Sequence, residues 1–336
     1  MTLLERFEQG DIRALSRLVS HVENRGEGFQ DLLGRLYSKA GHSLRIGVTG
    51  PPGAGKSTLV NGLARQFLNQ NKKIGIVAVD PTSPFTGGAL LGDRVRMNDF
   101  PIDGRIYFRS MATRGATGGL AAATDNVAIL YDAFGFDITL IETVGVGQVE
   151  LDIIDTCDVV VVVIVPESGD AVQMLKAGLM EIADIFCLNK ADRPGAERLA
   201  ADLRHTLETQ LMVAHARHTA SGLTTQRHTL VSHDNGEDHT IPIIQTEATS
   251  GKNVDALFAA INGYLEHSRQ SGLFDRNRRR RLRKKILNIL IHRFQGEFIS
   301  HLADESELDK AIDQIRSGQT NPYIISDQLY RQFLNR

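Results

Sequence analysis

The chain contains no tryptophan, and aromatic side chains make up only 6% of its 336 residues. Proteins that bind single-stranded nucleic acid stack the bases on aromatic side chains, so this composition argues against such a binding surface. The formal net charge of -2 gives no overall attraction to nucleic acid or to an anionic membrane surface. We therefore expect neither nucleic acid nor membrane among the partners of this protein.

Cysteines and long apolar runs are also scarce. The two cysteines, Cys157 and Cys187, lie in or beside apolar segments, which predicts buried thiols and excludes a disulfide framework. The longest wholly apolar run, residues 159–165, is far shorter than the roughly 20 residues that a membrane-spanning helix needs. The first residues carry no basic segment followed by an apolar core. We therefore expect a cytoplasmic protein.

Short segments rich in valine and isoleucine alternate with helical patterns between residue 44 and about residue 265. Near-continuous runs such as 159–165 are typical of strands that are buried on both faces. The alternation predicts an α/β domain with a doubly wound, mostly parallel sheet over residues 44–267. The seven expected strands are residues 44–49, 74–80, 105–109, 138–143, 159–165, 185–189 and 241–246.

Helical patterns without a recognisable chemical motif flank this domain. In residues 1–43, Asp11 is a predicted N-cap and Gly41 a predicted helix stop, and we expect this extension to pack on the sheet domain. Residues 268–336 contain a basic run at 276–285, which we interpret as the solvated start of an amphipathic helix rather than as a nucleic-acid surface. Because so many apolar positions in this C-terminal helical region need a covering surface, we expect it to form a homodimer.

Residues 205–239 interrupt the alternation with a polar stretch that contains six histidines. Only His215 and His218 have a spacing that suits metal ligation, and no cysteine lies nearby. A solvated insertion loop is therefore the preferred interpretation, and a metal site is the alternative.

The sharpest motif follows the first expected strand. Residues 50–57 match the G-x-x-x-x-G-K-[ST] pattern of a phosphate-binding loop at each fixed position. Glycines let backbone N–H groups turn toward an anion, and the following helix adds the positive end of its dipole. Lys56 is then the candidate ligand of the β- and γ-phosphates, and Ser57 that of Mg²⁺. The candidate nucleotide-binding residues here are Gly50, Pro51, Pro52, Gly53, Ala54, Gly55, Lys56, Ser57 and Thr58.

A second motif, N-K-x-D at residues 189–192, follows the sixth expected strand. The Asp192 carboxylate can accept hydrogen bonds from N1–H and the 2-amino group of guanine, a donor pair that adenine lacks. A backbone N–H of residues 247–249, after the last strand, would complete the guanine site. The candidate base-binding residues are Asn189, Lys190, Asp192, Glu247, Ala248 and Thr249. The two motifs together predict a protein that binds GTP and GDP.

Acidic residues end or follow two other strands. Glu142 ends an apolar strand three residues before Gly145, an arrangement that can hold Mg²⁺ and sense the γ-phosphate. Asp80 ends the second strand and Asp93 lies in the segment after it, where a helix N-cap is the alternative interpretation of Asp93. The candidate catalytic residues are therefore Lys56, Asp80, Asp93 and Glu142, and the candidate Mg²⁺ ligands are Ser57, Asp80, Asp93 and Glu142.

The two motifs, together with residues 80–83 and 142–148, resemble those of the metal- and cobalamin-associated GTPases. Residues 86–97 and 169–181 narrow the resemblance to the MeaB/ArgK family, also called methylmalonyl-CoA mutase-associated GTPases or LAO/AO transport kinases. The histidine-containing stretch departs from what we expect of this family.

This resemblance implies a P-loop GTPase domain with N- and C-terminal helical extensions, a homodimer held by terminal helices, and Mg²⁺ as the cofactor of GTP hydrolysis. It further implies a chaperone that gates cofactor loading and protection of a cobalamin-dependent acyl-CoA mutase, with methylmalonyl-CoA mutase as the first expectation. Residues 81–97, 143–157 and 165–177 would be three switch segments, the third facing the mutase.

Val146 occupies the position at which Ras-like enzymes place the glutamine that orients the attacking water. Valine cannot orient water, so we expect slow basal hydrolysis that a partner accelerates.

Two other functions stay open. A nickel metallochaperone would need a soft or imidazole metal site, whereas here the cysteines are isolated and the histidines lie in an internal stretch. A small-molecule kinase is suggested by the older family name, but the sequence contains no recognisable binding site for a phosphate acceptor.

Overall fold

The computed structural model of the chain describes residues 1–80, 104–112, 119–143, 153–168, 179–218, 241–301 and 305–334. The chain divides into two compact units, Met1–Arg278 and Arg279–Arg336.

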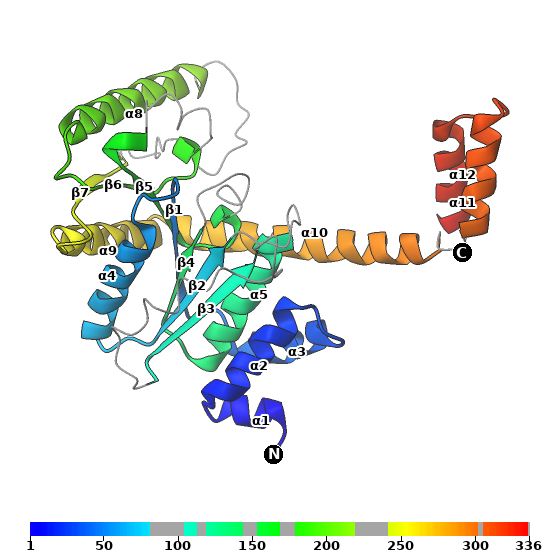
Figure 1. Cartoon of the computed structure of the whole chain (residues 1–336), viewed down its shortest axis with the longest axis horizontal. Coiled ribbons are helices and arrows are strands. Elements are labelled where there is room, and N and C mark those ends of the chain that lie inside the picture. The colour runs from blue at the N-terminus through cyan, green and yellow to red at the C-terminus, as the bar shows by residue number, and fades with distance from the viewer. Residues whose placement is uncertain are drawn as a thin grey trace. The chain divides into compact units, whose positions relative to one another are not determined.

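The first unit is built on a seven-stranded sheet in which all neighbouring strands are parallel, in the order β3-β2-β4-β1-β5-β6-β7 (Figure 1). The strands are β1 (Leu44–Thr49), β2 (Ile74–Asp80), β3 (Ile106–Ala112), β4 (Ile138–Glu142), β5 (Val159–Ile164), β6 (Ile185–Asn189) and β7 (Ile243–Thr246). Each expected strand forms, and the prediction of a doubly wound parallel sheet is confirmed. Because β1 lies in the middle of the sheet, the loop that follows it lies where ligands of such folds bind.

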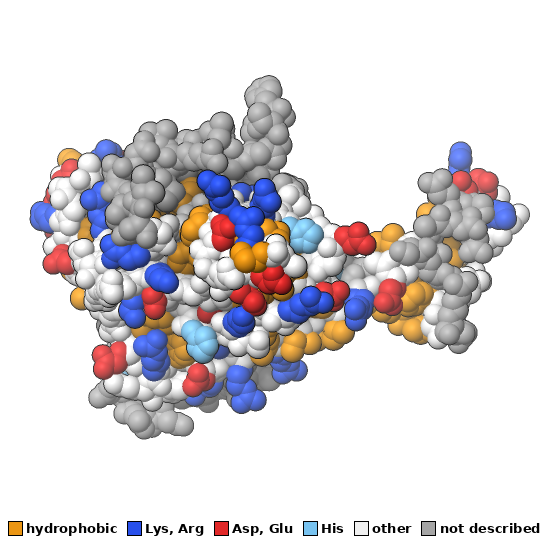
Figure 2. Space-filling model, turned by 90° about the horizontal axis from the view of Figure 1, so that it is seen from below, with side chains coloured by type: hydrophobic (Ala, Val, Ile, Leu, Met, Phe, Trp, Pro, Cys, Tyr) orange, Lys and Arg blue, Asp and Glu red, His pale blue; other side chains and the backbone are white. Residues whose placement is uncertain are grey.

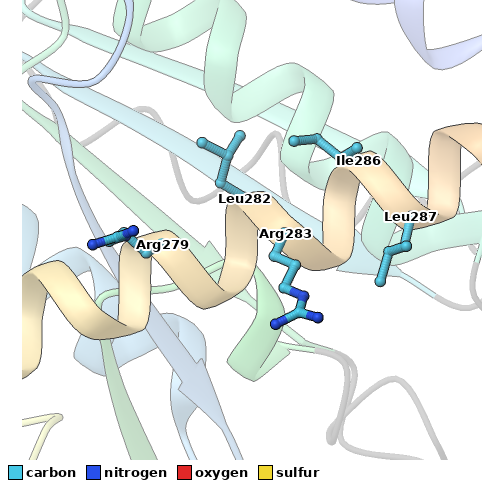
Figure 3. Close-up of a pocket in the computed structure, with 5 residues that line it drawn as sticks. All are labelled: Arg279, Leu282, Arg283, Ile286 and Leu287. Atoms are coloured by element: carbon cyan, nitrogen blue, oxygen red, sulfur yellow. The ribbon is translucent and has the colours of Figure 1, made fainter.

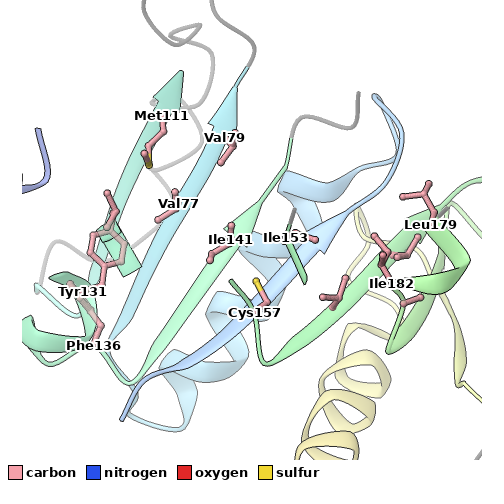
Figure 4. Packing of buried hydrophobic residues seen from close by; sticks show 14 of the residues in the cluster. Val77, Val79, Met111, Tyr131, Phe136, Ile141, Ile153, Cys157, Leu179 and Ile182 are labelled. Atoms are coloured by element: carbon pink, nitrogen blue, oxygen red, sulfur yellow. The ribbon is translucent and has the colours of Figure 1, made fainter. Parts of the chain in front are cut away.

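Helices cover both faces of this sheet. The helices α4 (Lys56–Asn69) and α9 (Val254–Gln270) pack on one face, and α5 (Gly119–Phe134) packs on the other (Figure 1). Successive strand residues point to opposite cores, so Leu140 lies in the first core and Ile141 in the second. Figure 4 shows Val77, Ile141 and Cys157 in the second core. This double burial explains why the strands read as continuous apolar runs.

The N-terminal helices extend the second core. They are α1 (Leu3–Glu8), α2 (Ile12–Glu23), α3 (Phe29–Leu36) and the 3-10 turn η1 (Tyr37–Lys39). Asp11 caps α2, because its Oδ1 accepts hydrogen bonds from the backbone N–H groups of Arg13 at 2.7 Å and Ala14 at 3.3 Å. This confirms the predicted N-cap. The buried residues Leu15 and Val19 of α2 belong to the same core as α5.

The remaining elements of the first unit lie between or after the later strands. They are the 3-10 turns η3 (Ile153–Asp155), η4 (Pro166–Ser168) and η5 (Leu179–Glu181), the helix α8 (Ala196–His218), and the start of α10 (Leu273–His301). Residues 205–218, for which the sequence predicts a loop, are the second half of α8. Alanine, leucine, glutamate, glutamine and methionine, which favour helices, account for this correction. Residues 219–240 lie outside the described part of the chain.

Both cysteines are buried, as predicted. Burial raises the pKa of the Cys187 thiol to about 12, and the hydrogen-bond contact with the Thr246 hydroxyl opposes this only in part. Within the described residues, no helix is both long enough and apolar enough to span a membrane.

The second unit contains the rest of α10 with α11 (Glu305–Arg316) and α12 (Pro322–Leu334). Phe294 and Phe298 of α10 both meet the ring of Phe333 edge-on, with centroids 5.3 and 5.2 Å apart. Hydrophobic side chains are nonetheless visible on its surface (Figure 2). The exposed apolar residues of α10 are Leu282, Ile286, Leu287, Ile289, Leu290, Ile291, Phe294 and Ile299.

The apolar residues of α10 do not form a single stripe. Five of the six residues at 286–291 are apolar and exposed, and at 3.6 residues per turn they spread over more than half of the helix circumference, which is wider than the apolar stripe of an amphipathic helix. The predicted amphipathic pattern is therefore wrong for this part of α10. Figure 3 shows Leu282, Ile286 and Leu287 with Arg279 and Arg283 around an open pocket on this helix.

Candidate nucleotide-binding site

The loop between β1 and α4 is shaped by glycines in the left-handed region. Gly50, Gly53 and Gly55 have φ angles of +136°, +74° and +87°. A Cβ at Gly50 would lie 2.0 Å from the carbonyl oxygen of Val163 in β5, and one at Gly55 would lie 2.3 Å from Nδ2 of Asn189. Glycine is therefore required at both positions by conformation and by close packing.

Lys56 is the first residue of α4 and is only 5% exposed. Its Nζ donates hydrogen bonds to the carbonyl oxygens of Gly50 at 2.7 Å and Pro51 at 2.9 Å. These carbonyls hold the ammonium group within the loop, beside the positive end of the α4 dipole. The loop thus combines a buried cation and a helix N-terminus, which is the electrostatic environment that phosphate groups prefer.

Ser57 and Glu142 meet beside this loop. The Ser57 hydroxyl donates to Oε1 of Glu142 over 2.5 Å, and Glu142 is the last residue of β4 and 9% exposed. The contact follows from the sheet, because β1 pairs with β4 so that Val48 lies opposite Glu142. A hydroxyl and a carboxylate supply the hard oxygen atoms that Mg²⁺ prefers, so these two side chains fit that ion.

Asn189 joins three segments at the end of β6. Its Nδ2 donates to the carbonyl oxygen of Ala54 at 2.8 Å. Its Oδ1 accepts from the backbone N–H of Ala248 at 3.0 Å and from the Thr246 hydroxyl at 3.2 Å. The side chain is 2% exposed, so the loop after β6 and the segment after β7 are fixed against the phosphate-binding loop.

The rest of the N-K-x-D motif forms a tight turn. Lys190 has a φ of +56°, and the N–H of Ala191 donates to the carbonyl oxygen of Thr246 at 3.0 Å. Asp192 is exposed at the tip of this turn. The hydrogen bond to Glu247 is the largest cause of the raised pKa of Lys252, and the negative charge of Asp192 adds to it. The carboxylate of Asp192 is therefore accessible at the surface of the turn.

Residues 247–249 are expected to supply one backbone N–H to the guanine site, and two of their three N–H groups are already used within the protein. The N–H of Glu247 donates to the carbonyl oxygen of Lys252 at 3.1 Å, and the N–H of Ala248 is used by Asn189. In the described part of the chain, Thr249 is the residue of this segment whose N–H has no hydrogen bond. The side chains of Glu247 and Lys252 form an ion pair of 2.5 Å, whose hydrogen bond is the first cause of the lowered pKa of Glu247.

The structure brings Lys56, Ser57 and Glu142 together and places the base-binding loop against the phosphate-binding loop. Asp80 ends β2, two residues beyond the residue that pairs with Glu142. Asp93, Gly145 and Val146 lie outside the described residues. In the described part of the chain, no three histidine, cysteine or acidic side chains form a group that could hold a metal ion.

Sequence reasoning does not identify two polar contacts beside the site. Thr246 binds Asn189, and the hydroxyl oxygens of Thr49 and Thr143 lie 2.8 Å apart. The available signal is a threonine at the end of an otherwise apolar strand, where a buried hydroxyl needs a partner.

A phosphate-binding loop after the central strand of a parallel sheet, braced by an N-K-x-D turn, defines a P-loop nucleotide-binding protein. The sequence model of a family described as "Methylmalonyl Co-A mutase-associated GTPase MeaB" matches residues 15–302. The chain belongs to this family of GTPases, which confirms the resemblance found in the motifs.

Named relatives agree with this assignment. A protein of Pyrococcus abyssi, named as a GTPase, is 39% identical over 334 residues, which are 99% of this chain and 96% of the relative. GTPase ArgK of Escherichia coli is 36% identical over 214 residues, 62% of this chain and 64% of the relative. The fused isobutyryl-CoA mutase of Geobacillus kaustophilus is 38% identical over 222 residues, 63% of this chain and 20% of the relative.

A solved structure supports the fold. The crystal structure of a LAO/AO transport system kinase superposes with a TM-score of 0.64 at 21% identity and covers 99% of this chain and 97% of its own. The likeness extends over the whole chain and shows a shared fold.

Proposed function

We propose that this protein is a Mg²⁺-dependent GTPase that gates cofactor loading and protection of a cobalamin-dependent acyl-CoA mutase, with methylmalonyl-CoA mutase as the first candidate client. The observation that carries the nucleotide part is the hydrogen bond from Asn189 to Ala54, because it holds a guanine-type base loop against the phosphate-binding loop. Family membership and the mutase that contains a homologous segment support the choice of partner.

Each site residue has a distinct part in this proposal. Lys56 and the backbone N–H groups of the non-proline residues within 50–57 bind the phosphates, and Asp192 selects guanine. Ser57 and Glu142, completed by Asp80 and Asp93, would hold Mg²⁺. When bound, this ion neutralises charge on the phosphate oxygens.

Hydrolysis should be slow without the partner. Since Val146 cannot orient a water molecule, the chain lacks at this position the group that Ras-like enzymes use. Adding the mutase is expected to raise the rate of GTP hydrolysis, and a basal rate that the mutase leaves unchanged would contradict this part of the proposal.

Base selection is tested with Asp192→Asn. The amide of asparagine can donate to the 2-oxo group of xanthine but no longer accepts both guanine donors. The variant should lose GTP hydrolysis and gain XTP hydrolysis, whereas the parent should hydrolyse GTP and not ATP. Unaltered use of GTP by the variant would rule out Asp192 as the residue that selects guanine.

Following labelled γ-phosphate to water or to amino acids separates a GTPase from a small-molecule kinase.

We also propose that a second copy of the chain covers the exposed apolar residues of α10, including Ile286 and Leu290, which are 51% and 55% exposed. Burial of such side chains is a driving force for association. Light scattering should give the mass of a dimer, and Ile286→Glu with Leu290→Glu should shift it to a monomer. A monomeric parent would contradict the proposal.

A further inference from the structure

Two buried threonine hydroxyls join β1 and β4 at the end of the sheet that carries the nucleotide site. The hydroxyl oxygens of Thr49 and Thr143 are 2.8 Å apart, and the two residues are 0% and 3% exposed. Thr49 directly precedes Gly50, and Thr143 directly follows Glu142. The hydrogen bond therefore connects the strand end that leads into the phosphate-binding loop with the strand end that carries the acidic residue.

This bond lies where the backbone pairing of the two strands ends. The last paired residues are Val48 and Glu142, and the N–H of Thr143 donates to the carbonyl oxygen of Val48 at 3.1 Å. One residue further on, the side-chain hydroxyls of Thr49 and Thr143, not the backbone groups, link the two strands. Because successive side chains of a strand point to opposite faces, Thr143 is held on one face while Glu142 reaches Ser57 on the other.

We propose that Thr49 and Thr143 are positioning residues. They fix the position of the Glu142 carboxylate relative to the Ser57 hydroxyl, and thereby set the affinity for Mg²⁺ and the rate of GTP hydrolysis. This inference rests on the proposed function. Its physical basis is that Mg²⁺ demands near-ideal octahedral geometry at short distances. Loss of one hydroxyl leaves the other buried without its partner, and the strand end that carries Glu142 can then shift.

The chain supplies a matched control on the same two strands. The hydroxyl oxygens of Ser43 and Thr139 lie 3.1 Å apart and are also buried, at 1% and 0% exposure. This pair joins the opposite ends of β1 and β4, away from Ser57 and Glu142. Thr139→Val therefore removes a similar buried hydrogen bond without disturbing the site.

The experiment compares Thr143→Val, Thr143→Ser and Thr139→Val in the full-length protein. Two quantities are measured against Mg²⁺ concentration: the rate of GTP hydrolysis and the affinity for GDP. Since loss of a group that orients a metal ligand costs about 10- to 100-fold in metal affinity or activity, Thr143→Val should raise the half-saturating Mg²⁺ concentration at least about tenfold. Thr143→Ser keeps the hydroxyl and should have the half-saturating Mg²⁺ concentration of the parent. Thr139→Val should lower the melting temperature and leave the Mg²⁺ dependence unchanged.

The inference is overturned if Thr143→Val retains the parental Mg²⁺ dependence in both measurements, or if Thr139→Val shifts it equally. A parent that does not hydrolyse GTP would refute the proposed function instead, while the Mg²⁺ dependence of GDP binding still decides the role of the hydroxyl pair. Should Thr143→Val fail to fold, Thr49→Val carries the same expectation from the other strand.

Discussion

The side-chain amide of Asn189 donates a hydrogen bond to the main-chain carbonyl oxygen of Ala54 over 2.8 Å. The two residues belong to different loops, and the same asparagine also receives hydrogen bonds from Ala248 and Thr246. One buried side chain therefore holds the phosphate-binding loop, the base-binding turn and the segment after β7 in a fixed relation. Such bracing limits the number of arrangements that the three segments can adopt, and a preorganised site lowers the entropic cost of binding.

Asn189→Ala should weaken nucleotide binding. It leaves the carbonyl of Ala54 and the donors of Ala248 and Thr246 without this partner, and each unpaired buried group costs about 1–3 kcal/mol. We expect the Kd for GDP, measured by titration calorimetry, to rise at least about tenfold, which corresponds to about 1.4 kcal/mol. Asn262→Ala is the control, because Asn262 makes only a local bond to its own helix on the exposed side of α9. Equal affinities of the two variants would contradict the bracing role.

Two glycines of the phosphate-binding loop should differ in their tolerance of alanine. Gly53 and Gly55 both have positive φ angles, so each alanine variant meets about 1–2 kcal/mol of backbone strain. A Cβ at Gly55 would also lie 2.3 Å from Nδ2 of Asn189, whereas one at Gly53 has no atom within 4 Å. Urea unfolding should therefore show a larger decrease in the free energy of unfolding for Gly55→Ala than for Gly53→Ala. GDP binding should fail in Gly55→Ala alone. Similar losses in both variants would show that the contact with Asn189 is unimportant.

The strands and both motifs could be predicted because their signals are local. Strand burial on two faces produces runs such as residues 159–165, and the glycines of residues 50–57 are dictated by the loop that they form. The contact of Asn189 with Ala54 could not be predicted from spacing, since 135 positions separate them. It depends on the strand order, which places β6 two strands away from β1 with β5 between them, and no local pattern encodes that order.

Two of the failed predictions have reasons that are also physical. The helix α8 continues to His218 because its residues favour helix although their apolar spacing is poor. In the basic run at 276–285, Arg278 is not solvated as predicted: it donates to the buried carboxylate of Asp158, which belongs to the turn before β5. A run of charged residues in a sequence predicts exposure to solvent. It does not show which of these residues forms an ion pair with a buried group.

Arg278→Met should strongly destabilise the first unit. The Asp158 side chain is 1% exposed and accepts from Nε and Nη2 of Arg278 at 2.9 and 2.8 Å. Removing one partner of a buried ion pair leaves an uncompensated charge, which costs about 3–5 kcal/mol. The backbone N–H of Arg45 also donates to Asp158 at 3.0 Å, so we expect the lower end of this range in urea unfolding. Arg276→Met, at an exposed position of the same helix, should cost less than about 0.5 kcal/mol.

Comparable free energies of unfolding for the two arginine variants would show that the ion pair with Asp158 contributes little. A restored stability in the double variant Arg278→Met with Asp158→Asn would instead support the explanation, because the second change removes the buried charge that has lost its Arg278 partner.

Cys187 should make the protein less stable at alkaline pH. Burial raises the pKa of its thiol from 9.0 to about 12 in the folded chain. Above about pH 9 the unfolded chain releases this proton while the folded chain keeps it, so the free energy of unfolding falls as pH rises toward 12, by about 1.4 kcal/mol per pH unit. Urea unfolding of the parent and of Cys187→Ala between pH 8 and 10.5 measures this difference. Other alkaline groups, such as the buried Tyr131, titrate in both proteins and cancel. Parallel pH profiles would mean that the thiol ionises with equal ease in the folded and the unfolded chain.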